Sequence, residues 1–476
     1  MTIVTSGGAA RRPRRRRSGQ REVGFGAFLA SGPAAWRGQS GAATAAMLMV
    51  AVMMVLGGGI PGVLATLVVG AAALVLLACL PASGFGAALR AQPALFRIGL
   101  AGAALLPLLQ IVPLPPSVWQ GLPGQALRIR TLELAGLSAS WQPLSVAPVF
   151  TAGAAVIAIA FAALVTVLLA VSVADLRRVA WMILGLVGVN FLIGLVQVGS
   201  GGAAFDFYTD SDRGAFIGLY ANKNHAALIL AASVPIAAYL LDSRREARAT
   251  RAWLGLYAGL VAVALVTTNS RAGIVLGALA LISTAILYVR SVRPAYLVAG
   301  AVAAIAGIVL ISTTPAFEKV FSRFEVVDQD LRWQYLATSR WLVERYWTLG
   351  SGIGSFSTLY AIGEPLAVVR PTYVNQLHDE YPQLLIEAGL PGAFALLALL
   401  SGVVLQAAKV WRRGERAARL PLACGGLVLL LVALHSSVDY PLRRPAVLPI
   451  FALAIALVVR GDLVPTRRLV HREQRA

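Results

Sequence analysis

Charged residues are scarce in this chain. Asp, Glu, Lys and Arg make up only 13% of its 476 residues, whereas 58% are hydrophobic. A soluble domain of this size needs far more charge to cover its surface, so the composition excludes an ordinary soluble protein. Cysteine is also rare. Cys79 and Cys424 are the two cysteines, and both fall inside apolar stretches, where a structural disulfide is not expected.

The sequence also lacks the motifs of metal and nucleotide sites. It contains neither CxxC nor HExxH, so we expect no metal. The glycine-rich stretch "LGSGIGSF" (349–356) lacks the lysine and hydroxyl residue of a phosphate-binding loop. No predicted cytoplasmic loop is long enough for a nucleotide-binding domain. We therefore expect no cofactor, and ATP-driven transport is excluded.

Long apolar runs are what the chain has instead. A helix needs about 20 residues to cross the hydrocarbon core of a bilayer. The candidate stretches are 43–58, 62–82, 95–113, 149–171, 178–198, 222–241, 252–267, 271–289, 296–313, 384–408, 420–438 and 446–460. They are continuous and rich in Leu, Ala, Val and Gly, unlike the alternating strands of a membrane barrel. The sequence predicts an all-α polytopic membrane protein with about 12 transmembrane helices and a large periplasmic loop containing amphipathic helices.

The formal charge of +20 follows the predicted topology. With the N-terminus inside, 28 of the 41 Lys and Arg lie on the cytoplasmic side against 7 of the 21 acids, and the outer segments hold 13 of each sign. This asymmetry is the positive-inside rule, so the basic excess orients the protein in the bilayer. Nucleic-acid binding by "RRPRRRR" (11–17) is the alternative, and we expect no nucleic-acid partner.

The topology divides the chain into five parts. They are a basic cytoplasmic tail expected to be disordered (1–42), transmembrane helices 1–9 (43–313), a large periplasmic loop (314–382), transmembrane helices 10–12 (383–460) and a second basic cytoplasmic tail (461–476). Within the loop, "DQDLRWQYLATSRWLVERYW" (328–347) has the pattern of an amphipathic helix at the lipid headgroup level. Arg332, Arg340 and Arg345 would project from it.

Basic side chains gather at the predicted outer face. Arg271 opens a span, where a positive charge opposes the helix dipole unless an anion joins it. Because the guanidinium fork matches pairs of phosphate oxygens, we hypothesise a pyrophosphate site. Its members would be Arg213, Lys223, Arg271, Arg332 and His378, with Asn222, Asn224 and His225 crowding the mouth of one span. The alternative is that each arginine pairs with a nearby acid, for which Asp210, Asp212, Asp328, Asp330 and Glu380 are available.

"QLHDEYPQLLIEAGLPG" (376–392) places titratable residues at the edge of an apolar run. His378 is a candidate for chemistry, or it only hydrogen-bonds at the start of a helix. Because "GLPG" (389–392) bends the helix, we expect Glu387 to satisfy freed backbone groups or a neighbouring helix. His435 marks a helix end, where we expect a structural cluster with Asp439, Arg443 and Arg444.

Three stretches resemble, in order, the motifs of the O-antigen ligase and O-antigen polymerase superfamily. They are "GLYANKNHAA" (218–227), "SRAG" (270–273) and "HDEYPQLLIEAGLPG" (378–392), and the resemblance runs from about residue 150 to 450. The family pattern usually has His-Asn where this chain has His378-Asp379. It commonly has Asn-Pro-Asn where this chain has Asn222-Lys223-Asn224.

The resemblance implies a metal-independent glycosyltransferase on the periplasmic face of the bacterial inner membrane. Its donor would be a glycan on undecaprenyl pyrophosphate. It implies catalytic roles for His378, Arg271 and Arg332. Substrate-binding roles would fall to Arg213, Lys223, Asn222, Asn224 and Arg340, and secondary structural roles to Glu387, Asp379, His225 and His435. His378 would accept the acceptor's hydroxyl proton or hydrogen-bond the pyrophosphate, and both roles stay open.

Several functions remain in competition. A ligase would move a finished glycan onto lipid A core, and a polymerase would extend an O-antigen or exopolysaccharide on its lipid carrier. A secondary transporter or flippase of lipid-linked saccharide is an alternative from another class, and a protein O-oligosaccharyltransferase is a lesser variant. Transporters keep their binding residues near the bilayer midplane in paired repeats. Here the charges gather on one face and no internal repeat is evident, which favours the transferase.

Overall fold

The computed structural model describes the following residues: 40–59, 63–78, 82–208, 214–241, 248–288, 331–369, 374–412, 416–461 and 463. The predicted span 296–313, Arg213 and nearly all of both predicted tails lie outside these residues. The same holds for residues 314–330 and 370–373 of the predicted large loop.

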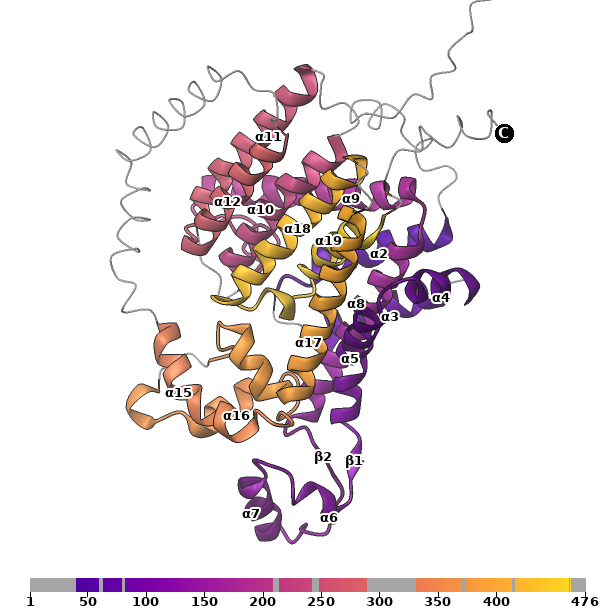
Figure 1. Cartoon of the computed structure of the whole chain (residues 1–476). Helices are drawn as coiled ribbons and strands as arrows, with labels where there is room; N and C mark the ends of the chain where they lie inside the picture. The colour runs from indigo at the N-terminus through magenta and orange to yellow at the C-terminus, as the bar shows by residue number, and fades with distance from the viewer. Residues whose placement is uncertain are drawn as a thin grey trace, which may run out of the picture. The chain divides into compact units, whose positions relative to one another are not determined.

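Helices dominate the described part of the chain (Figure 1). Those of the first half are α2 (Gly41–Leu56), α3 (Val63–Ala78), α4 (Ala82–Arg90), α5 (Ala94–Gln110), α6 (Pro116–Trp119), α7 (Ala126–Leu134), α8 (Pro148–Ala170) and α9 (Val173–Gly199). Those of the second half are α10 (Lys223–Leu241), α11 (Arg248–Thr267), α12 (Arg271–Tyr288), α15 (Leu331–Tyr346), α16 (Phe356–Gly363), α17 (Glu380–Arg412), α18 (Arg416–Ser436) and α19 (Leu448–Val459). Two short 3-10 turns, η4 (Leu366–Val368) and η5 (Pro441–Arg443), complete the set.

Many of these helices have the length and apolar character of membrane spans. Within the described residues, α8, α9, α10, α17 and α18 are long and apolar enough to cross a bilayer, and six further apolar helices are shorter. Large apolar side chains also point outward, among them Leu74 (68% exposed), Leu192 (63%) and Val404 (65%). In lipid this exposure carries no penalty. The prediction of a helical integral membrane protein is confirmed, and the number of twelve spans stays a prediction.

Two features fix where the central helices begin and bend. α9 begins at Val173, earlier than predicted, because Ser172 caps it: the Ser172 hydroxyl accepts a hydrogen bond from the amide of Asp175 at 3.0 Å. α17 bends at Gly389, whose φ is 58° and ψ is −156°. The predicted bend at "GLPG" is therefore confirmed. A β-carbon on Gly389 would lie 2.6 Å from the amide nitrogen of Gly350, so only glycine fits this close approach.

α10 is the most enclosed of the long apolar helices: every residue from Asn224 to Leu240 is buried. It packs against α9, α11, α12 and α18, while α17 packs against α5, α15 and α19. Figure 1 shows α10, α12, α18 and α19 side by side above the start of α17. The N-terminal ends of α10 and α17 and the C-terminal end of α18 consequently meet in one region.

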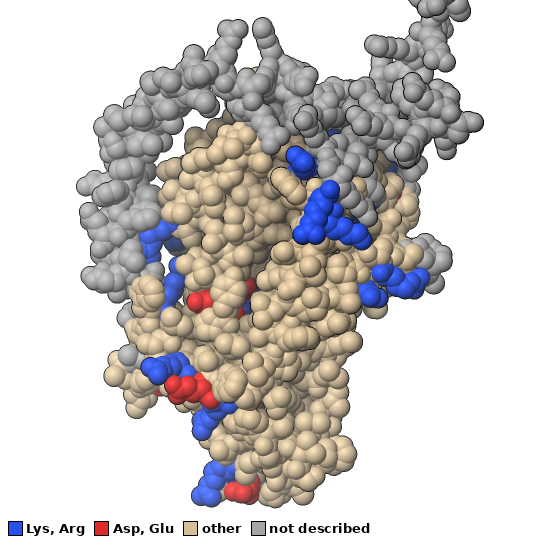
Figure 2. All heavy atoms as spheres, in the orientation of Figure 1, with Lys and Arg blue, Asp and Glu red and all other residues tan. Residues whose placement is uncertain are grey.

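The segment between α5 and α8 contains a short two-stranded sheet in the otherwise helical described part of the chain. β1 (Pro113–Leu114) pairs antiparallel with β2 (Gln142–Pro143) in a two-stranded sheet. The hydroxyl of Tyr346, at the end of α15, donates a hydrogen bond to the carbonyl of Gly124 at 3.0 Å. This contact joins the segment to α15, and both lie at the same end of the helices (Figure 1). On the face drawn in Figure 2, charged side chains gather in a few groups and leave broad uncharged areas between them.

Candidate active site

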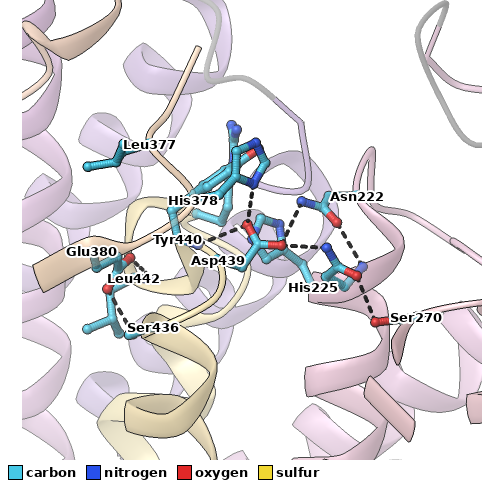
Figure 3. Close-up of polar contacts among 12 residues, drawn as sticks. Asn222, His225, Ser270, Leu377, His378, Glu380, Ser436, Asp439, Tyr440 and Leu442 are labelled. Atoms are coloured by element: carbon cyan, nitrogen blue, oxygen red, sulfur yellow. Dashed lines mark hydrogen bonds and ion pairs between the residues drawn. The ribbon is translucent and has the colours of Figure 1, made fainter. Parts of the chain in front are cut away.

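A buried carboxylate, Asp439, occupies the region where α10, α17 and α18 meet. It follows the last turn of α18, and its side chain is fully buried. One oxygen, Oδ1, accepts a hydrogen bond from the amide of Tyr440 at 2.9 Å. The other, Oδ2, accepts one from Asn224 Nδ2 at 2.6 Å and one from Asn222 Nδ2 at 3.4 Å (Figure 3). A charge buried to this degree requires such partners.

His378 reaches the same carboxylate from the loop that precedes α17. Its Nδ1 atom lies 3.3 Å from Asp439 Oδ1, and its side chain is 22% exposed (Figure 3). The ring of Tyr440 meets the His378 ring edge to face, with 4.9 Å between the centroids. One ring nitrogen of His378 therefore faces Asp439, while part of the side chain stays accessible.

Arg332 brings a positive charge to the opposite oxygen. Its Nη2 atom lies 3.7 Å from Asp439 Oδ2, and its side chain is 30% exposed. Arg332 belongs to α15, which is distant from α18 in sequence. The ion pair therefore joins α15 to the end of α18, and the neighbouring acids Asp328 and Asp330 lie outside the described residues.

The interactions of Asp439 fix its charge state. Burial alone would raise the pKa of the Asp439 carboxyl, but the side chains of His225 and His378 outweigh burial and hold this pKa well below its ordinary value. Asp439 is therefore ionised at any physiological pH. The site combines a permanent negative charge with an arginine and a histidine on either side of it.

The start of α10 supplies the remaining partners of Asp439. His225 is 1% exposed, and its Nε2 atom lies 3.6 Å from Asp439 Oδ1. The Asn222 side chain accepts a hydrogen bond from the Asn224 amide at 2.7 Å, which caps the helix. Asn224 Oδ1 in turn accepts a hydrogen bond from the hydroxyl of Ser270 at 2.7 Å (Figure 3). Ser270 immediately precedes Arg271, so this bond links the start of α12 to the Asp439 network.

Two amide side chains of α9 hold the loop that leads into α10. Gln197 accepts a hydrogen bond from the amide of Gly218 at 2.6 Å and donates one to the carbonyl of the same residue at 2.9 Å. Asn190 Oδ1 accepts a hydrogen bond from the amide of Leu219 at 2.7 Å. Both side chains are buried. The loop backbone before Asn222 is thus fixed from within the helix bundle.

Glu387 makes the contacts that the sequence predicted for it. One carboxylate oxygen accepts a hydrogen bond from the backbone amide of Phe356 at 3.0 Å, and the other pairs with Arg443 Nη1 at 2.5 Å. Glu387 is 1% exposed. Its contacts connect α17 to α16 and to the turn after α18, away from His378.

The predicted cluster of His435, Asp439, Arg443 and Arg444 was wrong as a single unit. Arg443 pairs with Glu387, and Arg444 donates a hydrogen bond to the carbonyl of Gly59 at 2.8 Å and lies over the Tyr440 ring. Asp439 is bound instead by residues from α10, α15 and the loop before α17. The four residues diverge because the turn after α18 points successive side chains in different directions.

Three residues place metal-ligand atoms near one another, a grouping that the absence of CxxC and HExxH motifs did not predict. His225, His435 and Asp439 offer ligand atoms that lie within 4.8 Å of one another, and all three side chains are buried. However, the Asp439 oxygens already face Tyr440 N, Asn224 Nδ2 and the Arg332 guanidinium. These groups are hydrogen-bond donors, one of them cationic, and they compete with a metal ion for the same lone pairs. Asp439 is therefore committed to hydrogen-bond donors, whereas the buried ring nitrogens of His225 and His435 have no hydrogen-bond partner among the described residues.

The structure brings together some predicted residues and not others. His378, Arg332, Asn222, Asn224 and His225 surround Asp439. Lys223 and Arg271 open α10 and α12 close to that network in sequence. Asp379 accepts a hydrogen bond from the amide of Tyr381 at 3.1 Å, as expected of a residue that starts a helix. Arg340 pairs with Glu344 on the exposed surface of α15 at 3.0 Å, so the local-acid alternative holds for this residue.

Asp439 was missed as the central residue. The one available signal was an acid directly after an apolar helix, at the end that also carries the other polar motifs.

The comparison with protein families identifies part of the chain. The family model described as O-antigen ligase matches residues 256–397. The matched region contains Arg271, Arg332, His378 and Glu387, and it ends before Asp439. No curated protein matches the chain. The resemblance to the O-antigen ligase and polymerase superfamily is thereby confirmed.

Proposed function

We propose that the protein is a glycosyltransferase of the O-antigen ligase or polymerase type, with its site on the periplasmic face of the bacterial inner membrane. It would transfer a glycan from undecaprenyl pyrophosphate to a sugar hydroxyl. The supporting observation is that His378 and Arg332, both inside the region matched by the O-antigen ligase family, meet at the buried carboxylate of Asp439.

In this proposal His378 is the general base. His378 Nδ1 lies 3.3 Å from the Asp439 carboxylate, whose charge favours a proton on Nδ1, and this tautomer leaves the Nε2 lone pair as the proton acceptor. When Nε2 takes the proton of the acceptor hydroxyl, the oxygen forms its bond to the anomeric carbon. The bond from that carbon to the pyrophosphate oxygen breaks, and its electron pair leaves with the lipid pyrophosphate. The Asp439 charge stabilises the imidazolium that His378 becomes.

The leaving pyrophosphate needs positive charge, and the arginines supply it in this proposal. Arg332 Nη2 lies 3.7 Å from Asp439 Oδ2 and the side chain is 30% exposed, and in this proposal its guanidinium meets the phosphate oxygens of the leaving group. Arg271 begins α12, where the helix N-terminus adds further donors for an anion. Stabilising charge on the leaving group is the main electrostatic task of this reaction.

The test is glycan transfer by purified protein in proteoliposomes, with an undecaprenyl-pyrophosphate-linked glycan as donor. Two acceptors, lipid A core and a second lipid-linked glycan, separate a ligase from a polymerase. His378→Ala should lower kcat by at least about 100-fold, the usual contribution of a general base. Arg332→Ala and Arg271→Lys should also lower it strongly, since lysine keeps the charge but loses the two-pronged geometry. Arg130→Ala, exposed on α7, is the matched control.

Release of free undecaprenyl pyrophosphate distinguishes the alternatives. A transferase forms one released carrier for each glycan transferred, whereas a flippase moves the lipid-linked glycan across the bilayer and releases none. Transfer by His378→Ala at the wild-type rate, at matched protein amount, would overturn the proposal.

A further inference from the structure

His378 sits in a strained backbone conformation that its surroundings must maintain. Its φ is 61°, in the left-handed region that residues other than glycine rarely adopt. Such conformations persist where neighbouring contacts hold the backbone in place. One contact lies just before His378: the amide of Leu377 donates a hydrogen bond to Gln383 Oε1 at 2.9 Å. On the C-terminal side of His378, the backbone is held by the first residue of α17.

Glu380 is that residue, and it binds the segment that carries Asp439. It is 8% exposed. Its Oε2 atom accepts a hydrogen bond from the Ser436 hydroxyl at 2.9 Å, and its Oε1 atom accepts one from the Leu442 amide at 2.8 Å (Figure 3). Ser436 ends α18 before Asp439, and Leu442 lies in η5 after it. The Glu380 carboxylate thus accepts hydrogen bonds from both sides of the turn that carries Asp439.

This geometry links the two halves of the site. His378 and Glu380 are separated by a single residue, and Asp439 lies between the two segments that Glu380 binds. Movement of the turn relative to α17 would therefore change the distance between His378 Nδ1 and Asp439 Oδ1. A general base loses efficiency when its geometry is disturbed by as little as about 1 Å.

We infer that Glu380 is a positioning residue that holds the Asp439 turn against His378, an inference that rests on the proposed transferase function. Glu380 does not touch the reacting atoms in this view. Ser436 and Leu442 are neutral donors, so Glu380 supplies a pair of acceptors to the turn, and its charge also interacts with Arg443. Glutamine keeps one acceptor oxygen for the Leu442 amide, and the Ser436 hydroxyl can turn to accept from the new amide group.

The experiment compares Glu380→Ala and Glu380→Gln in the proteoliposome transfer assay, with Glu133→Ala, an exposed acid on α7, as the control. Glu380→Ala should lower kcat by at least about 10-fold at nearly unchanged KM for the donor. Glu380→Gln should recover most of the wild-type kcat, and Glu133→Ala should equal the wild type.

A second measurement reports on His378 without transfer. The rate at which diethyl pyrocarbonate modifies His378, followed by mass spectrometry of its peptide, should rise in Glu380→Ala and return towards the wild-type rate in Glu380→Gln. Both readouts are normalised to folded protein.

The outcomes separate this inference from the proposed function. If His378→Ala abolishes transfer but Glu380→Ala keeps the wild-type kcat and His378 modification rate, Glu380 is not a positioning residue. If Glu380→Ala only lowers the amount of folded protein, its role is structural and the inference also fails. If transfer survives in His378→Ala itself, the proposed function fails, whatever Glu380 does.

Discussion

His378 Nδ1 lies 3.3 Å from Asp439 Oδ1, although one residue precedes α17 and the other follows α18. The contact places the buried, ionised carboxylate of Asp439 next to the imidazole ring of His378, which is partly exposed. Because the same carboxylate faces Arg332, it orients the histidine and the arginine relative to one another. The candidate site is therefore built around Asp439, to which three separate segments of the chain contribute.

The charge state of Asp439 predicts a particular dependence of stability on pH. Its folded-state pKa lies below the ordinary aspartate value of about 3.9. The stabilisation from its ionised form is thus complete above that value and is lost only as the pH falls through the lower, folded-state pKa. The difference in melting temperature between wild type and Asp439→Asn should not shrink between pH 7 and pH 5, and it should shrink below about pH 4.

Differential scanning fluorimetry in detergent measures this difference. If the difference instead shrank between pH 7 and pH 5, the folded-state pKa of Asp439 would have to be raised, contrary to its contacts.

Glu387 should behave as a structural residue. Glu387→Gln removes the buried carboxylate charge that pairs with Arg443. Breaking a buried pair costs about 3 kcal/mol or more, and the cost is smaller here because Arg443 is 17% exposed and also interacts with Glu380. We expect a clear fall in melting temperature and in the amount of inserted protein, with little change in kcat of the surviving protein. The control is Glu344→Gln, because Glu344 and Arg340 form an exposed pair worth less than about 1 kcal/mol. A large loss of kcat at normal stability would assign Glu387 to the chemistry instead.

The loop before α10 should tolerate no side chain at Gly218. Its φ is 63°, and a β-carbon there would lie 1.9 Å from Asn190 Oδ1, the atom that holds the Leu219 amide. Gly218→Ala should lower both the melting temperature and the transfer rate, since the displaced loop carries Asn222. Gly188→Ala is the control, because the space around that residue of α9 is open. Equal melting temperatures for the two variants would show that the loop does not depend on this close contact.

The predicted topology places α15 and α16 outside the cell membrane. A cysteine at Leu366, which is 93% exposed, should react with a membrane-impermeant maleimide added to intact spheroplasts of a strain whose native cysteines are replaced. A cysteine at Arg412, exposed at the opposite end of α17, should react only after the membrane is permeabilised. Leu366 is preferred to Tyr360, which is buried in the same segment. The reverse pattern of labelling would invert the orientation of the whole chain.

Transfer should not require a divalent metal, because arginine stabilises the leaving group in the proposed mechanism. Excess EDTA should leave kcat unchanged, and elemental analysis of the purified protein should find far less than one transition metal per chain. The outcome that would contradict this is a stoichiometric metal that His435→Ala removes, which would make His225, His435 and Asp439 a metal site.

Several features of the protein could be predicted from the sequence because their causes are local or statistical. The low charge and the long apolar runs require a helical membrane protein, since an unpaired backbone cannot lie in lipid. Gly389 and Pro391 in "GLPG" place the bend in α17, because glycine permits a left-handed φ and proline removes a donor. His378, Arg271 and Arg332 could be selected because charged groups at the edge of apolar helices need a reason to be there.

The tertiary structure alone decided which of these residues act together. In the sequence, Asp439 is one more acid close to Arg443 and Arg444. In the folded chain Arg443 pairs with Glu387, and Arg444 binds the carbonyl of Gly59. Glu380 looks like an ordinary first-turn acid, and Gln197 and Asn190 look like isolated amides in an apolar helix. Their partners lie on other elements, far away in sequence, and hydrogen bonds of about 3 Å leave no periodic trace along a chain. Such contacts exist only once the helices have packed, which is why the centre of the site could not be read from the sequence.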